Sequence, residues 1–257
     1  MNKSRFFLLL VILFAASFFW AGGRSLVVNY FPAAAKSEEL AGSVSSLWDR
    51  TYRIVALKSA VQAQLTTKNY VPLRDIPLIA QQAVIAVEDN RFYQHAGFDI
   101  EGILRATLVN VQTGQIQEGG STITQQLVKN LFLSSERSFG RKIEEFILAV
   151  DMELRYSKEE ILEMYLNTIY FGSGMYGIGD AADGYFGKTP AELTLAESAM
   201  LAGLPNAPSL NSPYVNFTAA RQRQAIVLNA MVKRSYIGPE QAETAQAQPI
   251  ILVPYQP

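Results

Sequence analysis

The chain has 257 residues, 49% of them hydrophobic, so it can bury a sizeable core as one large domain or two small ones. Its 22 lysines and arginines nearly balance 23 aspartates and glutamates, and we therefore expect no nucleic-acid partner. The sequence contains no cysteine, which excludes disulfides, cysteine-ligated zinc and thiol nucleophiles.

The N-terminus carries an apolar run over residues 6–21, preceded by Lys3 and Arg5. The run is short for a membrane-spanning helix, which needs about 20 residues, but the glycine pair at 22–23 can extend it. The positive residues favour a cytoplasmic N-terminus, so the body of the protein is expected outside. A cleaved signal peptide is the rival interpretation, although no small-x-small cleavage site follows promptly. We favour an uncleaved anchor.

Residues 76–87 are mostly apolar and predict a largely buried helix, with Asp75 placed to cap it. The segment ends in Glu88 and Asp89, so it carries two carboxylates to the edge of the core, and the only histidine, His95, follows. Partial burial raises the pKa of a carboxyl group and makes it a usable proton acceptor near neutral pH. The alternative is that both side chains end the helix in water, and this stretch alone favours neither interpretation.

A second stretch rich in candidate functional residues begins at Gly119 and Gly120. In it Thr122 and Gln125 form a capping box that predicts a helix start. Glycines before a helix start expose backbone N–H groups where the helix dipole favours an anion, and Lys129 can reach the same anion. No Gly-Lys-Ser/Thr follows the glycines, so this is not a Walker P-loop. A capped surface helix with a solvated lysine is the alternative to a phosphate site.

The remaining segments are also predominantly helical. Residues 99–118 predict a short amphipathic helix and then a polar, mobile half. Residues 138–156 predict a helix in which Arg141 and Glu145 point away from the core stripe. That expected stripe consists of Ile143, Phe146, Ile147, Val150 and Leu154.

Further downstream, Ser157 and Glu160 form another capping box. Thr189 is expected to open a helix that ends at Gly203. Residues 218–235 predict a last helix, followed by a proline-rich tail. No alternation of apolar and polar residues is long enough to predict a sheet.

Five ordered motifs carry a family resemblance. They are Glu88-Asp-x-x-Phe92-x-x-His95-x-Gly97, Gly119-Gly-Ser-Thr-Ile-Thr-Gln-Gln-Leu-Val-Lys129-Asn, Arg141-Lys-x-x-Glu145, Ser157-Lys-x-x-Ile161-Leu-Glu-x-Tyr165-Leu-Asn167, and Leu195-Ala-Glu-Ser-Ala-Met-Leu-Ala-Gly203-Leu-Pro. Together they closely resemble the peptidoglycan glycosyltransferases, glycosyltransferase family 51, found alone or as the N-terminal half of bifunctional penicillin-binding proteins. The resemblance covers about residues 72–213, and five motifs in order are far more specific than any one.

The resemblance implies a mainly α fold, with a lysozyme-like head and a smaller membrane-proximal jaw, preceded by one N-terminal transmembrane helix. The expected parts are a cytoplasmic tip and transmembrane anchor (1–23), a stalk and docking helix (24–71), a glycosyltransferase domain (72–235) with its jaw at about 99–119, and a C-terminal tail (236–257). The protein is expected in the bacterial cytoplasmic membrane, single-pass, with its catalytic domain on the extracytoplasmic face.

The resemblance also implies a reaction. The family polymerises lipid II, a disaccharide-peptide on undecaprenyl diphosphate, and forms a β-1,4 bond with inversion as the lipid diphosphate leaves. The expected partners are lipid II, the growing glycan chain and the membrane, together with penicillin-binding proteins and other wall-synthesis proteins.

By motif position, Glu88 is implied as the general base that takes the proton from the acceptor 4-hydroxyl. Glu145 matches the family's second glutamate and would hold the diphosphate through a divalent cation (Mg or Mn) or water, or orient Arg141. Lys129 and Arg141 would neutralise the leaving diphosphate, where charge develops in the transition state. No organic cofactor is expected.

The other motif positions receive binding or structural roles by the same resemblance. Thr122 and Gln126 would hydrogen-bond phosphate or sugar, and Asp89 would shape the substrate and diphosphate site. The residues expected to be structural at the site are Phe92, His95, Gly97, Gly119, Gly120 and Ser121.

Rival functions remain open from the sequence. The chain has neither Ser-x-x-Lys nor Lys-Thr-Gly and ends soon after the glycosyltransferase region, so a monofunctional enzyme is expected. A glycan-cleaving enzyme such as a lysozyme or lytic transglycosylase is one alternative, but it needs no anion-binding helix start. An inactive membrane-anchored scaffold of wall synthesis is another, but it has no need for Lys129 and Glu145.

Overall fold

The computed structural model describes residues 56–65, 69–113, 120–133 and 139–255. The chain separates into two compact units, Met1–Tyr52 and Arg53–Pro257, and every described residue belongs to the second. The expected anchor and most of the expected stalk therefore lie outside the described residues. Among the helices that are described, none combines the length and apolarity needed to cross a membrane.

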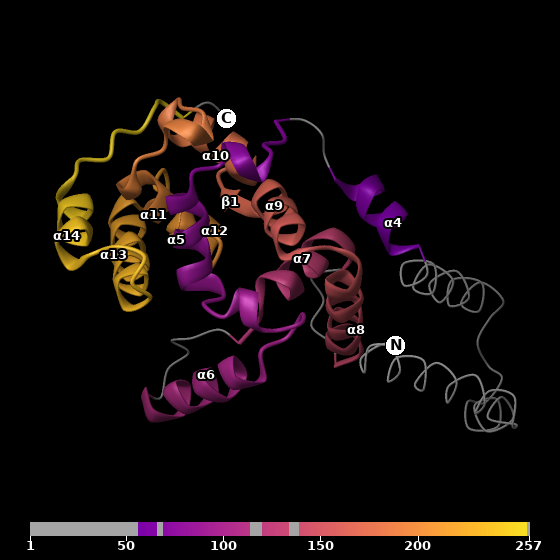
Figure 1. The fold of residues 1–257 in the computed structure, drawn as a ribbon. Coiled ribbons are helices and arrows are strands. Elements are labelled where there is room, and N and C mark those ends of the chain that lie inside the picture. The colour runs from indigo at the N-terminus through magenta and orange to yellow at the C-terminus, as the bar shows by residue number, and fades with distance from the viewer. Residues whose placement is uncertain (1–55, 66–68, 114–119, 134–138, 256–257) are drawn as a thin grey trace, which may run out of the picture. The chain divides into compact units, whose positions relative to one another are not determined.

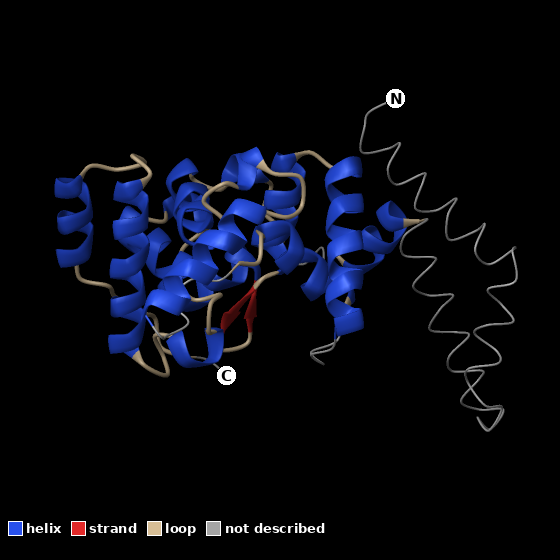
Figure 2. Cartoon of the chain, turned by 90° about the horizontal axis from the view of Figure 1, so that it is seen from below, coloured by secondary structure: helices blue, strands red, loops and turns tan. Residues whose placement is uncertain are grey.

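The described chain is helical apart from one small hairpin (Figure 2), which confirms the expected mainly α class. In chain order the elements are α4 (Leu57–Gln64), η2 (Leu73–Asp75), α5 (Leu78–Glu88), η3 (Phe92–Gln94), α6 (Ile100–Thr113), α7 (Ile123–Phe132), α8 (Phe139–Arg155), α9 (Lys158–Thr168), β1 (Tyr170–Gly172), β2 (Met175–Tyr176), α10 (Gly177–Phe186), η4 (Pro190–Glu192), α11 (Leu195–Gly203), α12 (Pro208–Asn211), α13 (Phe217–Lys233) and α14 (Pro239–Ala247).

Helix α5 packs against α11 and α13, while α7 packs against α8 and α9 (Figure 1). Small residues allow the first group to approach closely: Ala83, Ala196 and Ala199 are fully buried. A Cβ added at Gly203 would lie 3.1 Å from the Cβ of Arg223, so α11 and α13 meet almost backbone to backbone there. This packing fixes the end of α5, where the two candidate carboxylates stand.

The start of α5 differs from the sequence prediction. Asp75 ends the short turn η2, and the cap of α5 is Pro77, which has no side-chain bond to the helix. Ile76 is extended, with ψ of 123°, because a residue that precedes proline is disfavoured in helical geometry. The expected cap at Asp75 is therefore wrong, although the helix itself and its buried face are confirmed.

Helix α8 buries the opposite face from the one predicted. Ile143, Phe146 and Ile147 are exposed, whereas Glu145 and Leu148 are buried. The periodicity predicted the helix correctly, but α8 has apolar residues on two faces. The face that carries Glu145 is the buried one, because α7 and α9 pack there. Helix α6 likewise leaves its apolar residues Ile100, Ile103, Leu104 and Leu108 exposed.

Two predictions for the C-terminal part are also corrected. The helix expected to open at Thr189 is instead the short turn η4, and α11 starts separately with its own capping box between Thr194 and Glu197. The expected tail contains α14, where the side chain of Gln241 accepts a hydrogen bond from the N–H of Gly238. The prolines of this segment, at 239, 249, 254 and 257, favoured the prediction of an irregular tail.

The hairpin β1–β2 is a tight antiparallel connection between α9 and α10. Gly172 has φ of +90° and Gly174 has φ of +83°, values that L-residues rarely adopt. A Cβ at Gly172 would lie 2.4 Å from the carbonyl oxygen of Pro208, whereas one at Gly174 would meet nothing within 4 Å.

These two glycines give a matched test of the fold. Gly174→Ala should lower the free energy of unfolding by about 1–2 kcal/mol, the strain of positive φ alone. Gly172→Ala should lower it further, because the new methyl group also displaces the backbone near Pro208. Urea unfolding of both variants measures the difference, and equal stabilities would contradict the close approach at Gly172.

Candidate active site

Glu88 is the last residue of α5 and is partly buried. Its Oε2 accepts a hydrogen bond of 2.8 Å from Nε2 of Gln126 on α7. Burial raises the pKa of Glu88 above the ordinary carboxyl value. The Gln126 bond and the positive charges of Arg223 and Lys129 oppose this rise, and the charge of Asp89 adds to it.

Gln126 is held on its other side by a buried phenol. The hydroxyl of Tyr165 on α9 donates to Oε1 of Gln126 at 3.2 Å. Tyr165 is fully buried, and burial together with the charges of Glu88 and Asp89 raises its pKa well above the ordinary value. Both polar atoms of the Gln126 amide therefore have protein partners.

Asp89 joins the turn that follows α5 to the start of α7. Its carboxylate, 7% exposed, accepts from the backbone N–H of Ile123 at 3.0 Å and lies 2.9 Å from Nε2 of His95. Ile123 is the first residue of α7, so Asp89 supplies the negative charge that the helix dipole favours. The protein's own carboxylate thus occupies the position that the sequence analysis assigned to an external phosphate.

Thr122 is the N-terminal cap of α7, and its capping box with Gln125 is confirmed. Its hydroxyl accepts from the N–H of Gln125 and donates to the carbonyl oxygen of Gly97 at 2.8 Å. The side chain is 2% exposed and has no hydrogen left for a phosphate oxygen in this conformation. Gly97 has φ of +89°, and a Cβ there would lie 2.8 Å from the carbonyl oxygen of Ala149, so α8 excludes any side chain.

Phe92 lies in η3, between Asp89 and His95, and is fully buried. Its ring meets that of His95 at an interplanar angle of 77°, and Nζ of Lys158 stands 4.4 Å from the ring centroid. Lys158 is also paired with Glu153 at 2.7 Å. These contacts fix the turn that carries Asp89 and His95.

A second charged group lies at the start of α8. Glu145, 2% exposed, is paired with Arg141 at 3.2 Å and with Lys142, whose Nζ also lies 3.5 Å from Oγ of Ser121. Through Lys142, this charged group therefore reaches the segment just before α7. A Cβ added at Gly120 would lie 3.3 Å from Cγ1 of Ile103, and Gly119 lies outside the described residues.

The contacts of Glu145 bear on the divalent cation expected near it. Both carboxylate oxygens of Glu145 already face cationic side chains. Within the described ranges, no cluster of three or more His, Asp or Glu side chains could hold a metal ion. As they stand, these residues do not fit Mg or Mn.

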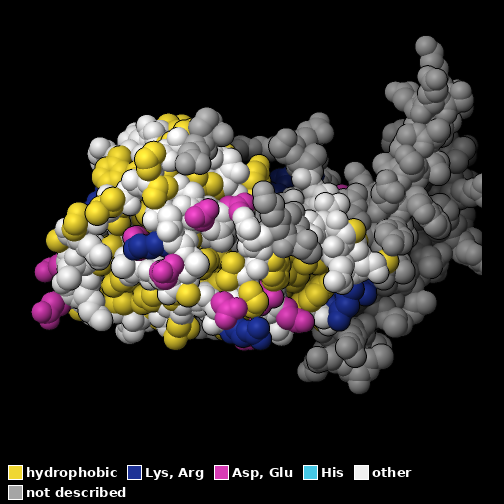
Figure 3. Space-filling view, turned by 90° about the horizontal axis from the view of Figure 1, so that it is seen from above, with side chains coloured by type: hydrophobic (Ala, Val, Ile, Leu, Met, Phe, Trp, Pro, Cys, Tyr) yellow, Lys and Arg dark blue, Asp and Glu magenta, His cyan; other side chains and the backbone are white. Residues whose placement is uncertain are grey.

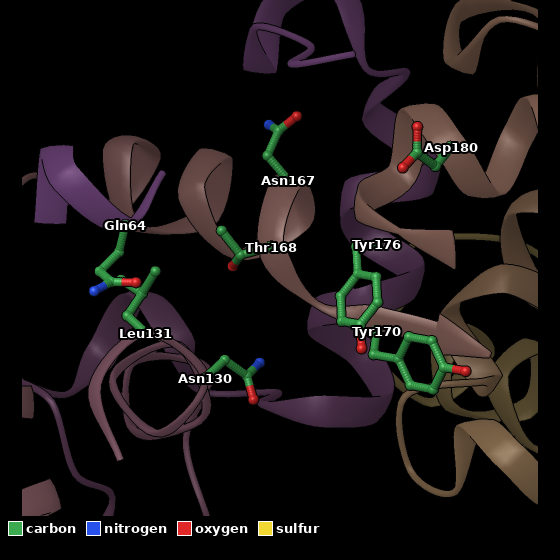
Figure 4. Close-up of a pocket in the computed structure, with 8 residues that line it drawn as sticks. All are labelled: Gln64, Asn130, Leu131, Asn167, Thr168, Tyr170, Tyr176 and Asp180. Carbon is green, nitrogen blue, oxygen red and sulfur yellow. The ribbon is translucent and has the colours of Figure 1, made fainter. Parts of the chain in front are cut away.

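A cavity of about 280 Å³ opens beside α7 and α9 (Figure 4). Its lining includes Asn130, which follows Lys129 on α7, and the rings of Tyr170 and Tyr176, whose centroids lie 4.6 Å apart. Asp180 and Asn167 add polar atoms to the same cavity. The lining residues combine aromatic faces with amide and carboxylate groups. This combination suits a ligand that has both a flat ring and polar substituents.

The structure thus places the motif residues in two groups. Glu88 at the end of α5 forms one with Gln126 and Lys129 of α7. Arg141 and Glu145 of α8 form the other, and Lys142 links it to Ser121 just before α7. Sequence reasoning missed three residues of this site. Tyr165 and Lys142 are motif positions to which the sequence assigned no role, and Arg223 lies in no motif.

Comparison with known proteins decides the family. The family model described as "Transglycosylase" matches residues 56–232, more than half of the chain. The chain belongs to the transglycosylase family. This membership confirms the resemblance to glycosyltransferase family 51 that the five motifs carry.

The transglycosylase chain is similar to part of longer proteins. It is 50% identical over 178 residues to penicillin-binding protein 1A of Neisseria flavescens, which covers 69% of the chain and 22% of that protein. It is 48% identical over 181 residues to penicillin-binding protein 1A of Aquifex aeolicus, covering 70% and 25%. A crystal structure of penicillin-binding protein 1A from Haemophilus influenzae matches with TM-score 0.36 and 32% identity, over 52% of this chain and 17% of that one.

The contact between Asp89 and α7 can be tested by stability. Asp89→Asn keeps the shape but turns one oxygen into an N–H₂ group facing donors, so the free energy of unfolding should fall by about 1–3 kcal/mol. Asp75→Asn is the matched control, because Asp75 is exposed and should change stability by less than about 0.5 kcal/mol. Equal unfolding midpoints in urea would contradict the role of Asp89.

Proposed function

We propose that this protein polymerises the glycan chains of peptidoglycan. The growing chain is transferred from undecaprenyl diphosphate to the 4-hydroxyl of the GlcNAc of lipid II, with inversion at the anomeric carbon. The observation that carries the proposal is Glu88, a carboxylate with a raised pKa at the end of α5, within the field of Lys129. The family membership of the chain supports the same reaction class.

Glu88 acts as the general base. Its raised pKa brings its proton affinity closer to that required near neutral pH, and as a carboxylate it takes the proton of the attacking hydroxyl. The attacking oxygen forms the new bond to the anomeric carbon as the bond to the lipid diphosphate breaks. The proton ends on Glu88 and the electron pair leaves with the diphosphate.

Side-chain cations stabilise the leaving diphosphate. Lys129 is exposed on α7 and lies close enough to Glu88 for its charge to lower the pKa of that carboxyl group. Arg141 and Lys142 lie in the first half of α8. Because Asp89 already bonds the first N–H of α7, these cations carry more of the task than the helix dipole does. Glu145 orients Arg141 and Lys142 through its two oxygens.

The cavity beside Tyr170 and Tyr176 receives a sugar unit of the chain. Tyrosine rings offer flat apolar faces, and Asn130 and Asp180 offer polar groups to hydroxyl groups. Asn130 lies one helical turn beyond Gln126, so α7 carries both a residue that lines the cavity and the amide that bonds Glu88.

The membrane-proximal jaw is formed by α6 and the exposed face of α8. Phe98, just before α6, packs on Phe146 of α8 with ring centroids 4.6 Å apart, which joins the two exposed apolar surfaces. An exposed apolar surface of this kind suits the lipid tails that accompany a lipid-linked substrate. Elsewhere, on the face drawn in Figure 3, acidic and basic side chains lie in small mixed groups.

A glycan-cleaving enzyme is less well supported. Such an enzyme protonates a leaving sugar and has no anionic lipid to release, so it does not need Lys129 beside Glu88 or the cations around Glu145. A scaffold without activity would not need a carboxylate with a raised pKa either.

Glu88→Gln tests the base directly. The variant should abolish elongation of labelled lipid II, because the amide cannot accept the proton, while the fold is retained. The assay is a gel of the glycan products with wild-type protein alongside. Shortened glycans from the wild type would overturn the synthase, and full elongation by the variant would remove Glu88 from its role.

The raised pKa of Glu88 also sets a pH dependence. Wild-type activity should fall as the pH drops through that raised pKa, because the base becomes protonated. Stability changes in the opposite direction: the folded state binds a proton more tightly than the unfolded state, so wild-type stability falls as pH rises from the ordinary carboxyl pKa to the raised one. Glu88→Gln should lack this loss, as pH-dependent urea unfolding would report.

Membrane contact by α6 can be measured with one label. The sequence has no cysteine, so Leu104→Cys gives a single attachment site for a nitroxide. On lipid vesicles the label should be accessible to oxygen and protected from a water-soluble nickel reagent. Leu210→Cys, also at an exposed leucine but on α12, is the control and should remain in water. Aqueous behaviour at both positions would contradict the jaw assignment.

A further inference from the structure

We infer that Tyr165 is a positioning residue which, through the amide of Gln126, holds Glu88 in one orientation and leaves its Oε1 free to receive the substrate proton. The inference rests on the proposed function, because it assigns a task to a residue behind the proposed base. Tyr165, Gln126 and Glu88 come from three different helices, α9, α7 and α5. The contacts run in series, from phenol to amide at 3.2 Å and from amide to carboxylate at 2.8 Å.

The chemistry of the three groups fixes the direction of each bond. An ionised carboxylate can only accept, so Gln126 must turn its N–H₂ group toward Glu88. The carbonyl oxygen of the amide then faces Tyr165, whose O–H donates to it. If the amide rotated by half a turn, its oxygen would face the carboxylate and the bond to Glu88 would be lost.

Tyr165 is suited to hold the amide because its donor does not vary with pH. The ring is fully buried, and burial raises the pKa of the phenol well above the ordinary value, so the phenol keeps its proton over the range in which Glu88 loses its own. Burial also leaves the side chain no route to the substrate. Its effect on the reaction must therefore pass through Gln126.

Other charges around Glu88 come from several elements and do not supply this orientation. Asp89 follows it, Lys129 lies on α7 and Arg223 lies on α13, and each acts on Glu88 through its charge. Helix α11, which also packs on α5, presents Glu197, whose carboxylate is paired with Lys188 at 2.7 Å. Within the described chain, only Gln126 donates a hydrogen bond to the Glu88 side chain.

The test is Tyr165→Phe, which removes a single oxygen. With lipid II as the substrate, kcat should fall about three- to tenfold, the loss of one hydrogen bond, while KM changes less than twofold. The acidic limb of the pH profile should move to higher pH, because a looser Gln126 stabilises the ionised Glu88 less. A purely structural role for the phenol would lower stability without moving this limb.

Tyr185→Phe is the matched control. Tyr185 is also fully buried, and its hydroxyl donates to the carbonyl oxygen of Phe171 at 3.0 Å, away from Glu88. Its removal should lower stability to a similar extent and leave kcat and the pH profile unchanged. Gln126→Leu approaches the same link from the other side: it should shift the acidic limb in the same direction, and adding Tyr165→Phe to it should have no further effect on kcat.

A readout without substrate separates this inference from the proposed function. Urea unfolding is measured against pH for wild type and Glu88→Gln, and for Tyr165→Phe with and without Glu88→Gln. Within each pair, the difference in stability reports the ionisation of Glu88. The window over which Glu88 lowers stability should extend to higher pH in Tyr165→Phe. An unchanged window overturns the inference even if wild type fails to elongate lipid II; multiplicative losses in the Gln126→Leu double variant overturn it as well.

Discussion

The contact between the Asp89 carboxylate and the first N–H of α7 is the constraint on which the rest of the site depends. It ties the end of α5 to the start of α7, and through His95 it also closes the turn that carries Phe92. A carboxylate at a helix N-terminus is favoured by the helix dipole, and here it is buried, where such an interaction is stronger. Once Asp89 is fixed in this way, the preceding residue, Glu88, must emerge beside Gln126.

This arrangement divides the work of the two adjacent carboxylates. Both oxygens of Asp89 contact protein donors, so Asp89 holds two segments together. Among the described residues, by contrast, Glu88 has a hydrogen bond to one oxygen only, and its pKa is raised. The division follows from their neighbours: two donors face Asp89, but burial dominates at Glu88. In the proposed function, the same logic assigns the diphosphate to the side chains of Lys129, Arg141 and Lys142, because Asp89 already bonds the first N–H of α7.

Local signals in the sequence predicted much of the fold. The capping boxes at Thr122 and Ser157 marked two helix starts correctly, because a cap depends only on residues three positions apart. The end of a buried helix at Glu88 was also found from its apolar composition. The sequence could not show that Thr189 opens only the short turn η4 while Thr194 caps α11, since adjacent capping boxes compete for one helix start. The start of α5 after Pro77 was missed because the residue before a proline is disfavoured in helical geometry, which separates Asp75 from the helix.

The sequence by itself determined the mainly helical class, the family and the identity of the charged motif residues, since these depend on local periodicity, residue type and order along the chain. Only the tertiary structure decided which helix faces are covered. Helix α8 has two apolar faces, and packing by α7 and α9 buried the one with Glu145 and left Phe146 exposed. Tertiary structure also decided the partners of Glu88, because Tyr165, Gln126 and Arg223 are far apart in sequence and meet only when their helices pack.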